Sequence, residues 1–303
     1  MFTPSRKLFS KQMSAALAAL LLAAAAPAWA DNEALFEQAA AAYEAGNYSQ
    51  AFRLFQSLAQ QGDAQAQYNL GVMYRDGQGV AQNYQQAVAW FQKAANQGYD
   101  SAQYNLGVLY LNGQGVAQNY QQAFAWFQKA ANQGNAAAQN NLGLMYENGR
   151  GMAQNYQQAL AWYQKAANQG DAKAQHNLGL MYYYGQGVVQ NYQQAFAWFQ
   201  KAANQGNAAA QNNLGLMYKN GRGVAQNYQQ ALAWYQKAAN QGDTAAQNNL
   251  GFMYANGQGV AQDSQQAKAL WQKVLAQPDT ADNAEAKASA RTGLQQLREM
   301  GIR

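Results

Sequence analysis

The sequence predicts an all-α fold: a right-handed α/α superhelical solenoid of antiparallel helix pairs with a capping element at each end. Three observations lead to this prediction. A unit of 36 residues recurs, each unit contains two segments with helical periodicity, and both ends of the array depart from the unit. A recurring unit of about 20–50 residues cannot bury its apolar face alone, so neighbouring units stack. The six units span residues 62–97, 98–133, 134–169, 170–205, 206–241 and 242–277.

The first half of each unit predicts a helix, which we call helix A. In the first unit it follows Asp63, a residue type that caps helix N-termini, and its Leu70 and Tyr74 lie four residues apart on one face. The second unit has Tyr99 at the capping slot, so we expect Asp100 to cap that helix one residue later. The remaining units carry Asn or Asp at the slot of Asp63, namely Asn135, Asp171, Asn207 and Asp243.

The second half of each unit predicts helix B, which opens with a capping box. We expect the Asn83 side chain to accept a hydrogen bond from the Gln86 backbone, and the Gln86 side chain to reach back to Asn83. Gly98, the first residue of the next unit, ends the helix as a C-cap. The same box recurs at Asn119, Asn155, Asn191, Asn227 and Asp263.

Gly71 lies inside helix A, where glycine costs about 1 kcal/mol relative to alanine. Because the glycine recurs in every unit, we expect helix B to approach closely there, over the indole of Trp90. The tryptophans of helix B are interpreted as core residues that pack the stack rather than as a ligand ladder. They are Trp90, Trp126, Trp162, Trp198, Trp234 and, displaced by one position, Trp271.

The residues that mark the unit are, in the first copy, Ala66, Leu70, Gly71, Tyr74, Gly77, Gly79, Val80, Ala87, Trp90, Phe91, Lys93, Ala94, Ala95 and Gly98. This pattern resembles the Sel1-like repeat, a relative of the tetratricopeptide repeat with a longer loop between its helices. Residues 31–61 resemble an ordinary tetratricopeptide helix pair, and residues 278–303 predict one amphipathic helix with Arg291 and Arg298 on its polar side. We expect these two segments to cap the stack.

The N-terminal 30 residues have the features of a signal peptide. A basic segment, residues 1–12, precedes an Ala/Leu-rich stretch, residues 13–26, that is shorter than the ~20 residues of a membrane span. Pro27 and an A-x-A signal, residues 28–30, then predict cleavage between Ala30 and Asp31. We therefore expect an exported bacterial protein, periplasmic or secreted, with no stable membrane anchor after cleavage.

The charge balance argues against nucleic acid as a partner. The formal net charge is +5, but three of the 20 basic residues, Arg6, Lys7 and Lys11, lie in the predicted signal peptide. The rest of the chain is nearly neutral and lacks the clustered Lys and Arg that phosphate binding needs.

The sequence offers little for catalysis. Cysteine is absent and His176 is the single histidine, so there is no thiol nucleophile and no plausible zinc site. We predict neither enzymatic activity nor a cofactor. Some cysteine-rich Sel1-like proteins have been assigned β-lactamase or penicillin-binding activity, and an envelope enzyme of that kind is the alternative. This chain lacks their paired cysteines and has no S-x-x-K motif in its mature part.

The resemblance implies that helix A lines a concave surface, as in tetratricopeptide-like solenoids. We therefore predict a protein-protein interaction scaffold that binds a protein or peptide there, in host interaction and virulence or in envelope assembly. A purely structural spacer is the other non-enzymatic interpretation.

One slot of helix A holds asparagine in every unit, at Asn69, Asn105, Asn141, Asn177, Asn213 and Asn249. Two interpretations of this asparagine ladder stay open: it holds the backbone of an extended peptide, or each amide bonds to the backbone of the neighbouring unit. The preceding slot contributes the candidate contacts Tyr68, Tyr104 and His176, although His176 also reads as one variant among polar surface residues.

A second slot, near the end of helix A, varies from unit to unit against this uniform background. We call it the variable slot and expect it to carry partner specificity. It holds Arg75, Leu111, Glu147, Tyr183, Lys219 and Ala255, and the position after it holds Tyr184 in the fourth unit. The candidates among these are Arg75, Glu147, Tyr183, Tyr184 and Lys219.

Overall fold

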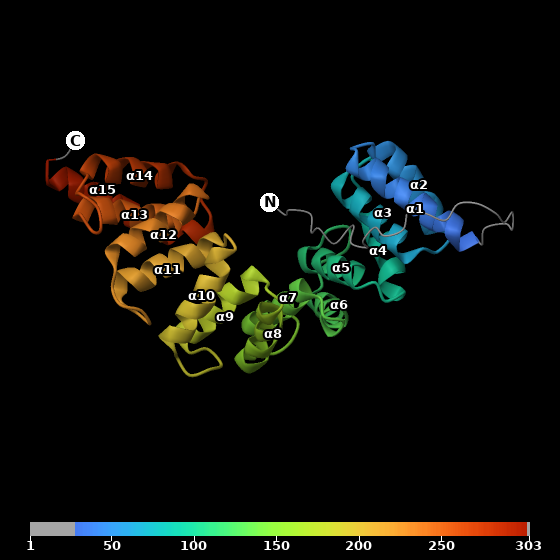
Figure 1. Ribbon diagram of the computed structural model, residues 1–303, viewed down its shortest axis with the longest axis horizontal. Helices are drawn as coiled ribbons and strands as arrows, with labels where there is room; N and C mark the ends of the chain where they lie inside the picture. Colours follow the sequence, from blue (N-terminus) through green and yellow to red (C-terminus); the bar gives the residue numbers. More distant parts are fainter. Residues whose placement is uncertain (1–27, 302–303) are drawn as a thin grey trace, which may run out of the picture. The chain divides into compact units, whose positions relative to one another are not determined.

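The computed structural model describes residues 28–301, and these are helical with no strand among them. Most of the predicted signal peptide, residues 1–27, lies outside the described residues, and residues 28–30 form the start of α1. The helices, labelled in Figure 1, are α1 (Ala28–Glu44), α2 (Tyr48–Gln60), α3 (Ala64–Asp76), α4 (Tyr84–Asn96), α5 (Asp100–Asn112), α6 (Tyr120–Asn132), α7 (Ala136–Asn148), α8 (Tyr156–Asn168), α9 (Ala172–Tyr184), α10 (Tyr192–Asn204), α11 (Ala208–Asn220), α12 (Tyr228–Asn240), α13 (Thr244–Asn256), α14 (Ser264–Ala276), the 3-10 turn η2 (Ala281–Asn283) and α15 (Ala284–Glu299).

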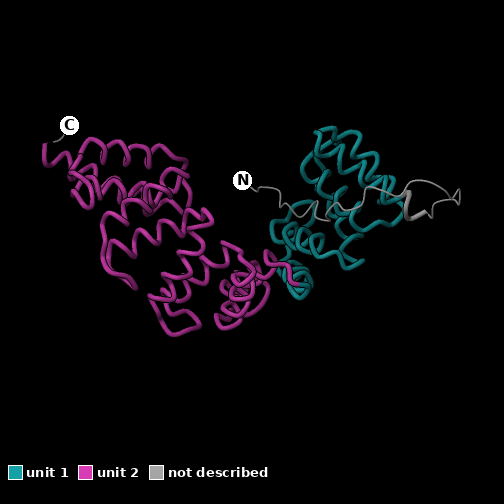
Figure 2. Tube along the Cα trace, viewed as in Figure 1, with its two compact units in different colours: residues 1–133 teal, residues 134–303 magenta. Residues whose placement is uncertain are grey.

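The helices form two compact units, divided after Gln133 (Figure 2). In the first, the pairs α1/α2, α3/α4 and α5/α6 pack in series. In the second, α7/α8, α9/α10, α11/α12 and α13/α14 do the same, and α15 packs on α13 and α14. Helix A of each 36-residue unit is therefore α3, α5, α7, α9, α11 or α13, and helix B is the helix that follows it. The fold is the predicted all-α solenoid of antiparallel helix pairs. Among the described helices, none is long and apolar enough to cross a membrane.

The predicted caps of helix A are confirmed, with one correction. Asp63 Oδ1 accepts from the backbone nitrogen of Ala66 at 2.6 Å. Asp100 does not cap its helix: α5 begins at Asp100, and its N-cap Tyr99 makes no side-chain cap bond. The backbone N–H of Tyr99 donates to the Ala94 carbonyl at 3.1 Å. This bond fixes the turn before α5, so the helix begins at the equivalent position without a capping side chain. Caps equivalent to Asp63 are Asn135, Asp171, Asn207 and Asp243.

Half of the capping box predicted for helix B is present. Asn83 Oδ1 accepts from the Gln86 backbone at 3.0 Å, as expected. The other half is wrong, because the Asn83 N–H donates to the Tyr74 carbonyl at 2.8 Å instead of bonding to Gln86. The backbone N–H of Asn83 therefore connects the long loop to helix A, and the side chain of Gln86 is exposed to solvent.

The helix A glycine is explained by a ring of helix B, although not by the expected one. A Cβ on Gly71 would lie 2.6 Å from Phe91 Cδ1, a distance that real Cβ atoms do not tolerate. The ring is thus Phe91 rather than Trp90. The same contact joins Gly107 to Phe127, Gly143 to Tyr163, Gly179 to Phe199, Gly215 to Tyr235 and Gly251 to Trp271. Trp271 therefore occupies the ring slot of the last unit.

The interpretation of the helix B tryptophans as packing residues is confirmed. Trp126 is 8% exposed and joins one buried cluster with Val72 and Phe91 of the preceding unit. Lys129 Nζ lies 4.0 Å from the Trp126 ring centroid and covers its outer face, a cation–π contact. The equivalent pairs are Trp90 with Lys93, Trp162 with Lys165, Trp198 with Lys201 and Trp234 with Lys237.

A buried glutamine in helix A connects three helices. Gln67 is 5% exposed; its Nε2 donates to the Ala59 carbonyl of the preceding helix B at 3.1 Å, and its Oε1 accepts from Gln97 at 2.9 Å. Both ends of the buried amide are bonded, so its desolvation is compensated. The same two bonds are made by Gln103, Gln175, Gln211 and Gln247. This glutamine slot was not among the residues predicted from the sequence.

We expect Gly179→Ala to destabilise the protein. Alanine normally stabilises a helix interior relative to glycine by about 1 kcal/mol, but here its Cβ would lie 2.6 Å from two atoms of the Phe199 ring. Overpacking of this kind costs about 1–3 kcal/mol. Chemical denaturation followed by circular dichroism measures the change, and Phe199→Leu in the same chain should recover part of the loss. A more stable Gly179→Ala protein would contradict the contact.

Candidate functional site

In the first compact unit, the candidate residues of helix A are already engaged with one another. Asn105 is 9% exposed; its Oδ1 accepts from Arg75 Nη1 at 2.6 Å, and its Nδ2 donates to the Ser101 carbonyl at 2.8 Å. The Arg75 guanidinium also makes a salt bridge with Asp76 at 2.7 Å. Asn69 is 4% exposed, and its Oδ1 has no hydrogen-bond partner among the described residues. These two ladder positions are more buried than a peptide-binding surface requires.

In the second compact unit, the ladder asparagines bond to the preceding helix A. Asn177 Nδ2 donates to Asn140 Oδ1 at 3.0 Å, and Asn249 Nδ2 makes the same bond to Asn212. Asn213 Nδ2 lies 3.0 Å from His176 Nε2. Each bond thus joins a ladder residue to the slot one position earlier in the neighbouring unit. This geometry supports the structural interpretation, with a side chain rather than the backbone as the partner. Peptide binding by the ladder, including the partly buried Asn141, stays a prediction.

The slot before the ladder packs against helix B. The ring of Tyr68 lies 5.8 Å from that of Phe91, and the ring of His176 lies 5.7 Å from that of Phe199. Tyr104 is partly buried and lies 5.8 Å from the Phe127 ring. The expectation that His176 is one polar surface variant is wrong, because its ring is packed into the helix pair. This burial lowers the pKa of His176 to about 4, so the ring is neutral at pH 7.

One member of the variable slot is bonded within its own unit, and another is partly buried. Glu147 Oε2 accepts from the Tyr163 hydroxyl at 2.6 Å. Burial and this neighbouring carboxylate raise the pKa of Tyr163, which therefore stays protonated and donates. Lys219 is partly buried, and this burial lowers its pKa.

At the end of helix A in the fourth unit lies a group of residues that we call the Tyr183 cluster: Tyr183, Tyr184, Val189 and Tyr192 of that unit, with Arg222 of the next unit. Tyr183 is 7% exposed, and its hydroxyl accepts a hydrogen bond from Arg222 Nη1. The Arg222 guanidinium carbon lies 5.6 Å from the ring centroids of both Tyr183 and Tyr192. The cluster thus places an exposed cation over two rings, one of them buried.

The outer part of the cluster is apolar and exposed. Tyr184 is 63% exposed and stands edge-on to Tyr183, with ring centroids 5.0 Å apart. Val189 is 85% exposed. Gln190 Nε2 donates to the Tyr183 carbonyl at 2.8 Å, so the loop folds back and brings Val189 to the end of α9. Aromatic residues and arginine are the residue types that dominate binding hot spots.

In the other units, the positions equivalent to Tyr184, Val189 and Arg222 hold mostly small or polar residues. The slot of Tyr184 elsewhere holds Asp76, Asn112, Asn148, Asn220 and Asn256. The slot of Val189 holds only alanine, at Ala81, Ala117, Ala153, Ala225 and Ala261. The slot of Arg222 holds Gln78, Gln114, Gln186 and Gln258, with Arg150 as the exception. Val189, Tyr192 and Arg222 were not predicted from the sequence. Val189 and Arg222 do depart from the residues at the same loop positions of most other units, and this departure is a signal that could have identified them.

This arrangement provides contact area and hydrogen-bond donors, and it does not pair a nucleophile with a base. Within residues 28–301 there is no group of three or more His, Cys, Asp or Glu side chains that could hold a metal ion.

Comparison with known proteins defines the class. Among solved structures, similar chains include a protective antigen present in uropathogenic Escherichia coli strains, displaying an SLR fold (34% identity over 88% of this chain, TM-score 0.74). A Sel1 repeat protein from Oxalobacter formigenes is 31% identical over 81% of this chain and 98% of its own, with a TM-score of 0.75. The match covers 61% of the E. coli protein's length. No curated protein matches the sequence.

The chain belongs to the Sel1 repeat family. Repeats of this family match residues 38–63, 64–99, 100–135, 136–171, 172–207, 208–243 and 244–277. The last six matched repeats begin two residues after the glycine that opens each unit. The first covers part of the segment expected to be an N-terminal cap.

We expect the stability of the protein to fall in acid because of His176. Its pKa is lowered from 6.5 to about 4 in the folded state, so its contribution is fully present above about pH 6.5 and is lost as the pH falls towards 4. The groups it contacts, Asn177, Asn213 and Phe199, do not titrate. His176→Asn introduces the residue found at this slot in Asn140, Asn212 and Asn248 and removes the effect.

Chemical denaturation of both proteins between about pH 7 and pH 4 measures the difference. The wild type should lose up to about 3 kcal/mol of unfolding free energy relative to His176→Asn over this interval. Parallel losses in the two proteins would show that His176 is not the titrating group.

Proposed function

We propose that this protein is an exported scaffold that binds another protein, and that the Tyr183 cluster is the centre of the binding surface. Sel1 repeat proteins are commonly protein-interaction scaffolds. The observation that carries the proposal is the departure of one unit from an otherwise uniform array. Tyr184 and Val189 are exposed, and they stand where the other units hold small or polar residues.

Export is part of the proposal and rests on the sequence alone. The basic segment, the apolar stretch and the A-x-A signal before Asp31 support a periplasmic or secreted protein. The similar E. coli protein is described as a protective antigen, which is compatible with a role in host contact. Envelope assembly is the other setting in which an exported scaffold would work.

The cluster favours a partner segment that combines an apolar side chain with a carboxylate. Tyr184 and Val189 provide apolar contact area. Arg222 uses Nη1 for Tyr183, and its remaining N–H groups make no hydrogen bond among the described residues. A planar guanidinium that is already fixed on aromatic rings can bind a carboxylate with little further loss of side-chain freedom.

The test uses substitutions that the chain itself supplies. Tyr184→Asn, Val189→Ala and Arg222→Gln restore the residues found at the same slots in other units, so the fold should be retained. A partner is first captured by crosslinking from the envelope fraction and then purified. We expect the triple variant to bind it at least about tenfold more weakly, since a hot-spot residue contributes about 2 kcal/mol or more.

Arg150→Gln is the matched control, because it makes the same change at the same slot of the third unit. It should bind like the wild type, and circular dichroism should show all three proteins equally helical. Unchanged affinity in the triple variant, with a partner in hand, would place the binding surface elsewhere.

A further inference from the structure

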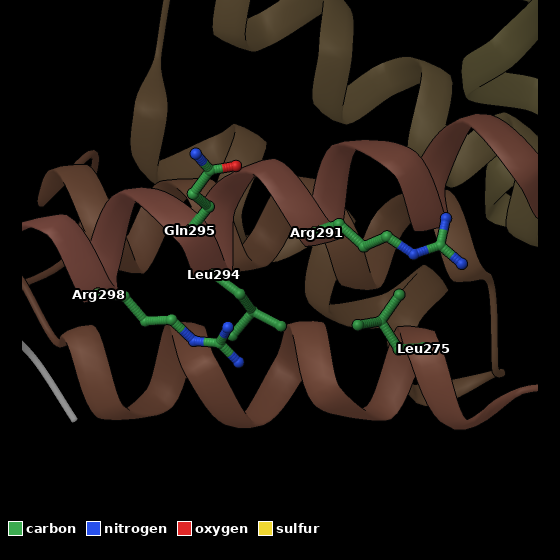
Figure 3. A pocket seen from close by; sticks show the side chains of 5 residues that line it. All are labelled: Leu275, Arg291, Leu294, Gln295 and Arg298. Atoms are coloured by element: carbon green, nitrogen blue, oxygen red, sulfur yellow. The ribbon is translucent and has the colours of Figure 1, made fainter.

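The last helix carries two arginines beside a shallow cavity. Arg291, Leu294, Gln295 and Arg298 of α15 line it together with Leu275 of α14, and its volume is about 290 Å³ (Figure 3). Figure 3 shows Leu294 between the two arginines along α15. The site is thus an apolar floor with a cation at each end.

These two cations have no counter-charge of their own. Neither guanidinium makes a salt bridge or side-chain hydrogen bond with any described residue, and both side chains are exposed. Asp279 is held by Lys287, whose hydrogen bond and charge lower the pKa of that carboxyl, and Arg291 adds only a smaller attraction. Glu299 accepts from Gln295 at 2.9 Å. The cavity therefore favours an anionic, partly apolar occupant.

Helix α1 carries acidic side chains that also lack an ion-pair partner among the described residues. Glu33, Glu37 and Glu44 of α1 are exposed, and none of them makes a salt bridge or hydrogen bond among residues 28–301. Lys and Arg are absent from α1. Ala41 lies exposed between Glu37 and Glu44, and its small side chain allows another helix to approach closely.

The spacings of the two sets match. Glu37 and Glu44 are seven residues apart, as are Arg291 and Arg298, so each pair lies on one helix face about 10.5 Å apart along the axis. Each pair also has a residue between its two charges, and the numbers of positions that separate the three residues agree when the two helices run antiparallel. From Glu37 to Ala41 to Glu44 the steps are four and three, and from Arg298 to Leu294 to Arg291 they are again four and three.

We propose that α1 of one copy docks antiparallel into the α14/α15 cavity of a second copy. Glu37 then pairs with Arg298, Glu44 with Arg291, and Ala41 lies on Leu294. The contact joins two different surfaces, so it is heterologous and extends head to tail into chains or closes into rings. It does not involve the Tyr183 cluster and is independent of the proposed function.

Exposed ion pairs are individually weak and are screened by salt, which fixes the form of the test. Sedimentation velocity of the purified exported protein over a concentration series should show reversible self-association. The association should weaken between about 0.05 M and about 0.5 M NaCl. Arg291→Glu with Arg298→Glu replaces two attractions by two repulsions and should lower the association constant roughly tenfold or more.

The decisive comparison reverses the charges on α1 as well as those on α15. Glu37→Arg with Glu44→Arg should weaken association as strongly, and a chain carrying all four changes should associate like the wild type. The control carries Gln157→Glu, Gln158→Glu, Gln193→Glu and Gln194→Glu, which change the net charge by the same amount at exposed positions of α8 and α10 and should leave association intact. A wild-type protein that stays monomeric in low salt would overturn the proposal. So would association that survives the arginine changes, or a fourfold variant that fails to recover it. Binding of another acidic helix by an otherwise monomeric protein would assign the cavity to a different partner and equally overturn it.

Discussion

The contact between a helix A glycine and a ring of helix B sets the geometry on which the rest of each unit depends. With Gly179 against the Phe199 ring, the two helices approach to a distance that no larger residue permits. At that distance the buried glutamine of helix A reaches both the preceding helix B and the end of its own helix B. One small residue thereby fixes the spacing within a pair, and one buried amide fixes the spacing between pairs. Because each unit repeats both contacts, stability is expected to be a sum of local terms.

The sequence predicted the parts of this arrangement that are local to a helix. Asp63 and Asn83 are recognisable as caps because capping depends on a residue and the backbone nitrogen three positions later. The glycine was recognised as a point of close approach, but the ring was assigned to Trp90 rather than Phe91. Trp90 and Phe91 are consecutive residues of helix B, and only the rotation of that helix decides which ring faces Gly71. The same limit explains why Gln67 was missed, since its partners Ala59 and Gln97 lie in two other helices.

Part of the Tyr183 cluster was recognisable from the sequence. Tyr183 and Tyr184 were recognised because they break a repeated pattern. Arg222 comes from the next unit and meets Tyr183 only when the two units stack, so spacing along the chain could not connect them. The asparagine ladder is a different case, because the sequence left both of its interpretations open. Its uniformity suggested a repeated function towards a ligand, whereas Asn177 and Asn249 make the same bond to the neighbouring helix A. These bonds support a structural role for a uniform slot, and a slot that varies is where we propose that a partner binds.

We propose that the uniform slots stabilise the stack and that the Tyr183 cluster binds the partner. Deletion of the fourth unit in register tests this proposal most directly. Removal of residues 170–205 joins the third unit to the fifth, whose glycine, ring, glutamine and asparagine slots hold the same residue types. The account predicts a shorter protein that is still folded, with helical circular dichroism per residue unchanged, and that no longer binds the partner captured by the wild type. Loss of helicity throughout would contradict the repeat frame, and full partner affinity in the folded deletion would contradict the assignment of binding to the Tyr183 cluster.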